Sequence, residues 1–117
     1  MTMSDKEFIR GVRSEVIASN LQAYRELLVG TRAEDASDSY WKTALQFFHE
    51  LDDASREVLF SIIRQVMVDT TSSLFAIFDG VSDIPGQDGT FEVRIGGRNL
   101  AGSLQDQFLA AEEEDHG

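Results

Sequence analysis

The segment from Val58 to Phe78 constrains the fold of this chain more than any other stretch. Its apolar residues recur at intervals of three and four positions, which places them on one side of an α-helix. The stripe consists of Leu59, Ile62, Ile63, Val66, Met67, Leu74, Ile77 and Phe78. Such a stripe is too apolar to face water. Phe60, Val68 and Phe75 lie off it, so we expect a central helix that other elements contact from several sides.

Polar residues interrupt the same helix, which argues against a membrane crossing. Arg64, Gln65 and the run from Asp69 to Ser73 leave no uncharged segment near the roughly 20 residues that a bilayer crossing requires. The chain contains no cysteine, and no basic, hydrophobic leader precedes its first charged residues. We therefore expect a soluble, cytoplasmic protein.

Acidic residues outnumber basic ones by a wide margin. The 117-residue chain has 21 aspartate and glutamate residues against 10 lysine and arginine residues, a formal charge of −11 at pH 7. This charge disfavours nucleic acid and anionic membranes as partners, because both bind to basic faces. An acidic band between positions 34 and 60 contains Glu34, Asp35, Asp38, Glu50, Asp52, Asp53 and Glu57. The partner that this band favours is a basic protein.

Capping signals predict a long first helix. Ser4 and Glu7 form a capping box, in which each side chain accepts a hydrogen bond from the other residue's backbone N–H. A helical apolar stripe follows as far as about Val29. Gly30 is expected to end this helix in a left-handed conformation, and Gly11 is expected to mark a close crossing with another helix.

A second helix is expected to begin at Ser37 or Asp38 and to carry the heaviest aromatic load of the chain. Its apolar residues are Tyr40, Trp41, Ala44, Leu45, Phe47, Phe48 and Leu51. The aromatic side chains Tyr40, Trp41, Phe47 and Phe48 are candidates for a binding platform, but their helical spacing favours a mostly core position, with Tyr40 or Trp41 at the edge. Asp52 or Asp53 then ends the helix and caps the central one.

Turn residues and alternation predict a β-hairpin after the central helix. Residues 80–90 include the only proline and three glycines, which indicates a loop. Residues 91–95 alternate between apolar and charged side chains, as in a strand with one wet face. Gly96 and Gly97 then provide a tight turn into a short return strand at 98–101. Two strands this short must pack on the helices.

The last element is expected to be a short helix capped by Ser103, with Leu104, Phe108 and Ala111 on one side. Its C-terminal carboxylates oppose the helix dipole, so the acidic tail 112–117 is expected to fray unless a basic partner holds it. The predicted fold class is α+β, mainly α: three long helices with a C-terminal β-hairpin and a short terminal helix. Residues 1–117 are expected to form a single compact domain.

Potential metal ligands are few and poorly spaced. The densest group is His49, Glu50, Asp52 and Asp53. It contains one imidazole, whereas a zinc site needs three or four converging ligands. The loop aspartates Asp79, Asp83 and Asp88 do not match the register of an EF-hand, and turn formation explains them. We therefore predict no metal and no cofactor.

The polar run in the central helix supports two interpretations. Asp69, Thr70 and Ser73, together with Asp79 at the end of the helix, are candidates for lining a polar pocket. The alternative is a solvated helix face with serine and threonine hydroxyls bonded to backbone carbonyls. Asp79 opposes the helix dipole, so a structural tie to Arg94, to Arg98 or to the N–H groups of the following loop is expected for it.

Motifs for catalysis are absent from the sequence. There is no Gly-x-Ser-x-Gly elbow, no phosphate-binding glycine loop with a lysine and no cysteine nucleophile, so no catalytic residue is predicted. The leading hypothesis is a small acidic interaction protein, for example an immunity-type inhibitor that docks on a basic partner through the acidic band. The alternative hypothesis is a ligand-binding or catalytic domain with the polar pocket just described. Homodimerisation through a helix face is a third.

Overall fold

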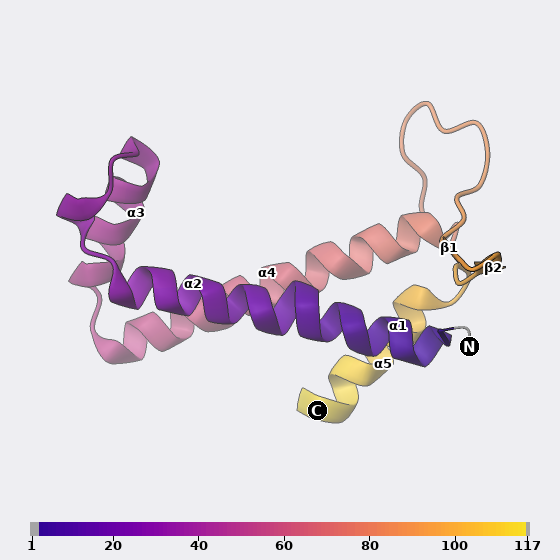
Figure 1. The fold of residues 1–117 in the computed structure, drawn as a ribbon, viewed down its shortest axis with the longest axis horizontal. Coiled ribbons are helices and arrows are strands. Elements are labelled where there is room, and N and C mark those ends of the chain that lie inside the picture. The colour runs from indigo at the N-terminus through magenta and orange to yellow at the C-terminus, as the bar shows by residue number, and fades with distance from the viewer. Residues whose placement is uncertain (1–2, 117) are drawn as a thin grey trace.

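The computed structural model describes residues 3–116, and most of them are helical (Figure 1). In chain order the elements are α1 (Asp5–Val12), the π-helical segment η1 (Arg13–Ala18), α2 (Ser19–Gly30), the 3₁₀ turn η2 (Ala33–Asp35), α3 (Ser39–Glu50), α4 (Asp53–Phe78), β1 (Arg94–Ile95), β2 (Arg98–Asn99) and α5 (Leu104–His116). The predicted class, mainly α with a small antiparallel hairpin, is confirmed. Among the described residues, no helix combines the length and the apolar character that crossing a membrane requires.

Two long helical segments organise the molecule. The elements α1, η1 and α2 continue into one another as a single rod, which lies against α4 (Figure 1). Helix α3 packs on α2 at one end of this pair. Helix α5 packs on α1 and α4 near the other end, next to the hairpin (Figure 1). The chain therefore forms an elongated body with principal extents of 49 × 35 × 26 Å.

The helix starts agree with the capping signals in the sequence. Ser4 Oγ accepts from Glu7 N at 3.1 Å, and Ser4 N donates to Glu7 Oε1 at 3.1 Å, which completes the capping box. Asp38 caps α3 by accepting from the backbone N–H of Tyr40. Asp52 caps α4 in the same way, with its carboxylate 2.7 Å from Ser55 N. Local side-chain chemistry was sufficient to predict these boundaries.

Two expectations about glycines are wrong. Gly30 is the last residue of α2 and has no left-handed conformation, because the chain leaves the helix through an extended Thr31. Gly11 lies on an exposed part of α1, and a Cβ placed there would meet no atom within 4 Å. Gly11 therefore does not mark a close helix crossing.

The interior is divided into two hydrophobic clusters. One cluster lies where α5 meets the rod and α4, and it contains Ile9, Ile17, Val68, Phe75, Leu100, Leu104 and Phe108. The other lies where α3 meets α2 and α4, and it contains Leu28, Leu45, Phe48 and Phe60. Helix α4 contributes to both clusters, so it connects the two ends of the molecule.

The side of α4 that faces the interior matches the predicted one only in part. From the predicted stripe, Leu59, Ile63, Met67 and Phe78 pack against the two clusters. The buried residues are Phe60, Val68, Thr71, Ser72, Phe75 and Ala76. From the predicted stripe, Ile62 is 55% exposed, Val66 58% and Leu74 49%. Aromatic packing explains why Phe60 and Phe75 are buried although they lie off the predicted stripe. The ring centroids of Phe60 and Phe48 lie 5.6 Å apart, and those of Phe75 and Phe108 lie 5.7 Å apart. The prediction that neighbours would cover the apolar stripe is wrong for this part of it.

The hairpin forms as the glycines predicted. Arg94 pairs with Asn99 and Ile95 with Arg98 in an antiparallel register. Gly96 and Gly97 join the strands with φ angles of 55° and 83°, values that favour glycine strongly. The segment between α4 and β1 extends away from the helices as a wide loop (Figure 1).

The terminal helix continues further than expected. Helix α5 extends to His116, and the side chain of Glu112 is buried against two arginines. The chain's own arginines thus supply the basic partner that the acidic tail requires to stay helical. The final residue of the segment expected to fray, at position 117, lies outside the described residues.

Candidate functional site

An apolar groove lies open between α2, α3 and α4. We call it the aromatic groove; it has a volume of about 420 Å³ and is lined by Tyr24, Leu28, Tyr40, Trp41, Ala44, Phe47, Phe48, Leu59, Ile62, Ile63, Val66 and Met67. All of these side chains are uncharged. A concave surface of this composition is typical of a site that binds another molecule.

Several side chains of the groove are far more exposed than their apolar character favours. Tyr40 is 65% exposed and Phe47 is 54% exposed, although both belong to the most aromatic helix of the chain. Tyr40 packs edge-on against Trp41, with ring centroids 5.0 Å apart, and Tyr24 meets Trp41 from α2 at 6.2 Å. The aromatic wall is therefore held in place by ring contacts while its outer side stays open to solvent.

Helix α4 forms the opposite wall of the groove. Val58, Ile62 and Val66 recur every four residues and produce an exposed ridge, which we call the apolar ridge. Val58 is 60% exposed, as much as the other two. The ridge ends at Asp69, where the polar run of α4 begins. The groove and the ridge adjoin each other, because Ile62 and Val66 belong to both.

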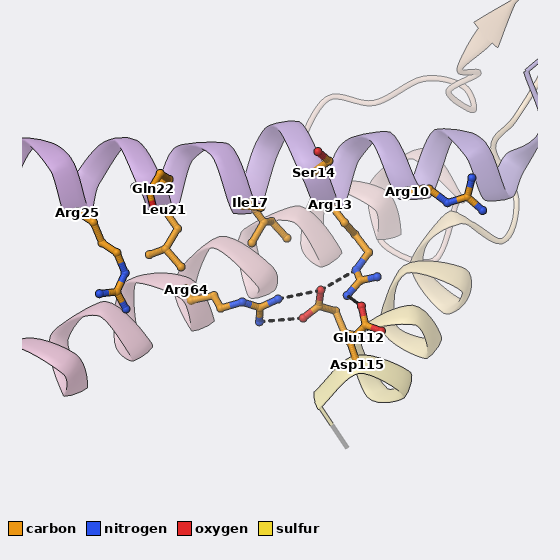
Figure 2. A pocket seen from close by; sticks show the side chains of 11 residues that line it. Arg10, Arg13, Ser14, Ile17, Leu21, Gln22, Arg25, Arg64, Glu112 and Asp115 are labelled. Carbon is orange, nitrogen blue, oxygen red and sulfur yellow. Dashed lines mark hydrogen bonds and ion pairs between the residues drawn. The ribbon is translucent and has the colours of Figure 1, made fainter.

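A second hollow, of about 500 Å³, lies between the α1–η1–α2 rod, α4 and α5 (Figure 2). We call it the arginine hollow, because Arg10, Arg13, Arg25 and Arg64 contribute to its lining. Segment η1 supplies several of the other lining residues, and π-helical segments are frequent at functional positions because they redirect side chains. This combination makes the hollow a candidate for anion binding.

Of the arginines named, Arg13, Arg25 and Arg64 already hold carboxylates of the chain. Glu112 Oε2 accepts from Arg13 Nε at 2.8 Å, and its Oε1 lies 2.9 Å from Arg64 Nη1 (Figure 2). Arg13 also pairs with Asp115. Burial raises the pKa of Glu112, but the hydrogen bonds from Arg64 and Arg13 outweigh it and hold the pKa below its ordinary value of 4.5. An incoming anion would have to displace Glu112, so this arrangement is a clamp that fastens α5 to the rod and to α4.

The predicted acidic band lies in η2, around α3 and at the start of α4, and most of its members have structural contacts. Asp38 and Asp52 cap helices, as described above. Glu34 and Asp35 both pair with Arg32, and Glu57 forms two hydrogen bonds with Arg25 on α2.

The two remaining members of the band, Glu50 and Asp53, are exposed and form no ion pair within residues 3–116. They lie close in sequence, at the end of α3 and the start of α4. The hydrogen bonds at Ser55 hold the pKa of the neighbouring Asp52 below its ordinary value of 3.8. The α3–α4 junction is thus anionic at neutral pH.

The four residues proposed for a polar pocket do not meet around either hollow. Asp69, Thr70 and Ser73 are exposed on α4, and Asp69 accepts from the side-chain amide of Gln65. The neighbouring Thr71 hydroxyl donates to Met67 O at 2.8 Å, which is the back-bonding expected of a solvated polar run.

Asp79 has a structural role at the opposite end of α4. Its carboxylate oxygens accept from Gly102 N at 2.7 Å and from Gln105 N at 2.8 Å, which ties the end of α4 to the start of α5. The expected tie exists, but its partners lie beyond the hairpin and not in the loop or on an arginine. Asp79 also provides the cap that we expected from Ser103, whose hydroxyl accepts from the Gln107 side chain instead.

Metal ligands do not converge in the part of the chain that the structure describes, where no three histidine, aspartate or glutamate side chains form a group able to hold an ion. In the densest sequence group, a ring nitrogen of His49, Nε2, lies 2.8 Å from Thr31 O. This contact connects α3 to the turn that precedes it. Asp52 of the same group is engaged as a helix cap.

Comparisons with protein-family models, with curated proteins and with solved structures find no match to this chain. Function is therefore inferred from the geometry of the two hollows and from the distribution of charge.

Sequence reasoning missed the arginine clamp and misplaced the apolar ridge. A signal for the clamp was present, since Arg64 lies one helical turn from both Phe60 and Val68 on the buried side of α4. A cation between two buried apolar residues requires an anion from another element. The ridge itself was visible in the sequence, but it was assigned to the interior.

Proposed function

We propose that the protein is a small acidic interaction protein that docks on a basic partner, of which an immunity-type inhibitor of a basic toxin or nuclease is one example. The observation that carries this proposal is that most basic side chains are already paired with carboxylates of the same chain. Among the residues that the structure describes, six of the ten basic side chains are engaged in ion pairs: Arg13, Arg25, Arg32, Arg64, Arg94 and Arg98. The excess carboxylates therefore dominate the outward field of the molecule.

The α3–α4 junction is the part of the acidic band best suited to docking. Glu50 and Asp53 are exposed there, and Asp52 adds a carboxylate that is fixed by its capping bond. Fixed charges that need no rearrangement lose little conformational entropy on binding. A partner with lysine or arginine side chains at matching positions would be steered to this end of the molecule.

The experiment is a pull-down with the full chain from an extract of the organism that produces it. Retention of a basic protein is expected at about 0.1 M salt and its release at about 1 M, because salt screens exposed charges over a few ångströms at the higher concentration. A variant with Glu50→Gln and Asp53→Asn is expected to weaken retention by roughly tenfold. Circular dichroism checks that the variant keeps its helices.

A matched control carries the same change of charge elsewhere. Glu113→Gln with Glu114→Gln removes two exposed carboxylates from α5, far along the chain from the α3–α4 junction. Retention by this control is expected to equal that of the unaltered chain. Capture that is the same at both salt concentrations, or equal weakening by the two variants, would contradict docking through the junction.

The alternative of a ligand-binding or catalytic domain has less support. Asp79 is occupied as a helix tie, and neither hollow includes Asp69, Thr70 or Ser73.

A further inference from the structure

The chain exposes more surface than a monomer of its mass requires. Its accessible surface is 7897 Å², whereas a compact monomer of 13.0 kDa is expected to expose about 6,300 Å². The radius of gyration, 17.8 Å, likewise exceeds the value of about 13 Å expected for a globular chain of this length. The difference in surface is about 1,600 Å². A stable dimer buries about 800 Å² or more on each partner.

Part of the exposed apolar surface lies on the aromatic groove and the apolar ridge. The groove and the ridge contribute six exposed large apolar side chains: Tyr24, Tyr40, Phe47, Val58, Ile62 and Val66. Exposed apolar surface of this kind marks an interface, because its contact with water is unfavourable in a monomer.

We infer that this surface is a homodimer interface, in which the apolar ridge and aromatic groove of one chain cover those of a second copy. The lining of the groove is uncharged, so two chains of net charge −11 can meet there without burying carboxylates against one another. A basic partner would instead bring lysine or arginine onto a wall that offers no carboxylate.

The spacing of the ridge suits packing against itself. Residues at four-residue intervals form a ridge that fits the groove beside the same ridge of another helix, with the axes crossing at about −50°. In a two-fold dimer the same patch serves both chains, so Ile62, in the middle of the ridge, lies nearest the axis. Phe47 and Tyr40 of each α3 then cover the flank of the partner's α4.

This dimer does not depend on the docking proposed above, because it uses uncharged side chains and not the carboxylates of the α3–α4 junction. The docking and the dimer also differ in their response to salt. Electrostatic docking weakens as salt rises, whereas burial of apolar surface persists. Failure of one is therefore distinguishable from failure of the other.

The experiment is sedimentation equilibrium of the full chain at about 0.1 M and about 1 M salt. A mass of twice 13.0 kDa is expected at both concentrations. Val66→Glu places a carboxylate on the ridge and is expected to weaken the dimer by roughly a hundredfold, because each copy would bury an unpaired charge. Val66 is 58% exposed in the single chain, so the monomer is expected to stay folded.

Val29→Glu is the matched control. Val29 is 59% exposed, lies in a helix like Val66 and is not among the lining residues of the groove. This variant is expected to remain dimeric. A monomeric unaltered chain at both salt concentrations would overturn the inference, as would equal dissociation of the two variants. A monomer that loses a captured protein on Val66→Glu would also overturn it, by assigning the groove to a different partner.

Discussion

Glu112 is a carboxylate on the inner side of α5, and arginines from two other helices bind it. Its exposed fraction is 8%, and both of its oxygens are engaged: Arg64 binds Oε1 and Oε2, and Arg13 also binds Oε2. Removing the charge would leave the guanidinium group of Arg64 partly buried without its anion, whereas Arg13 would keep Asp115. The clamp therefore concerns the attachment of the whole C-terminal helix and not Glu112 alone.

The variant Glu112→Gln is expected to lower the free energy of unfolding by about 1–3 kcal/mol. Glutamine keeps the shape of the side chain, so the loss reports the charge. Urea denaturation at neutral pH measures it. Glu113→Gln, at the exposed neighbouring position, is expected to stay within about 0.5 kcal/mol of the unaltered chain. Equal losses in the two variants would assign no special role to Glu112.

The stability that the Glu112 carboxylate contributes depends on pH. The pKa of Glu112 is lowered from 4.5 in the folded chain, since the hydrogen bonds from Arg64 and Arg13 outweigh the effect of burial. A carboxyl group with a lowered pKa contributes stability above its unfolded-state value and loses it as the pH falls through the folded value. The difference in stability between the unaltered chain and Glu112→Gln is thus expected to shrink as the pH drops below 4.5.

At the scale of single elements, helix boundaries were predictable where a side chain near the terminus satisfies backbone amides. Ser4, Asp38 and Asp52 cap the three long helical segments, and all three caps were expected from the sequence. The cap of α5 was not predictable in this way. It comes from Asp79, which is 26 residues away from the amide of Gln105. No local pattern contains a contact of that separation.

Glycines show the same limit of local reasoning, and they provide a test. Gly11 is exposed in a helix and has open space around the position of a Cβ, so Gly11→Ala is expected to stabilise the fold by about 0.5–1 kcal/mol.

Gly97 has a φ of 83° in the hairpin turn, and Gly97→Ala is expected to lower the free energy of unfolding by about 1–2 kcal/mol. Thermal denaturation measures both. A loss of stability in Gly11→Ala would indicate a neighbour at that position in solution.

At the scale of the whole molecule, the sequence predicted a central helix correctly and the side that it buries only in part. Periodicity identifies an apolar side of α4 but does not state which element covers it. Phe60 and Phe75 lie off the main stripe, yet they face the interior because rings from α3, α1 and α5 meet them there. The most continuous apolar ridge was left outside. This arrangement is consistent with the proposed dimer, in which a second copy covers the exposed ridge.

A homodimer couples stability to concentration, which gives the last prediction. Association that requires the folded chain raises the apparent melting temperature as the protein concentration increases. The unaltered chain is therefore expected to melt several degrees higher when its concentration is raised about a hundredfold. Val66→Glu is expected to melt at one temperature throughout this range, because its ridge no longer associates. Differential scanning calorimetry distinguishes the two. A melting temperature of the unaltered chain that does not change with concentration would contradict the dimer.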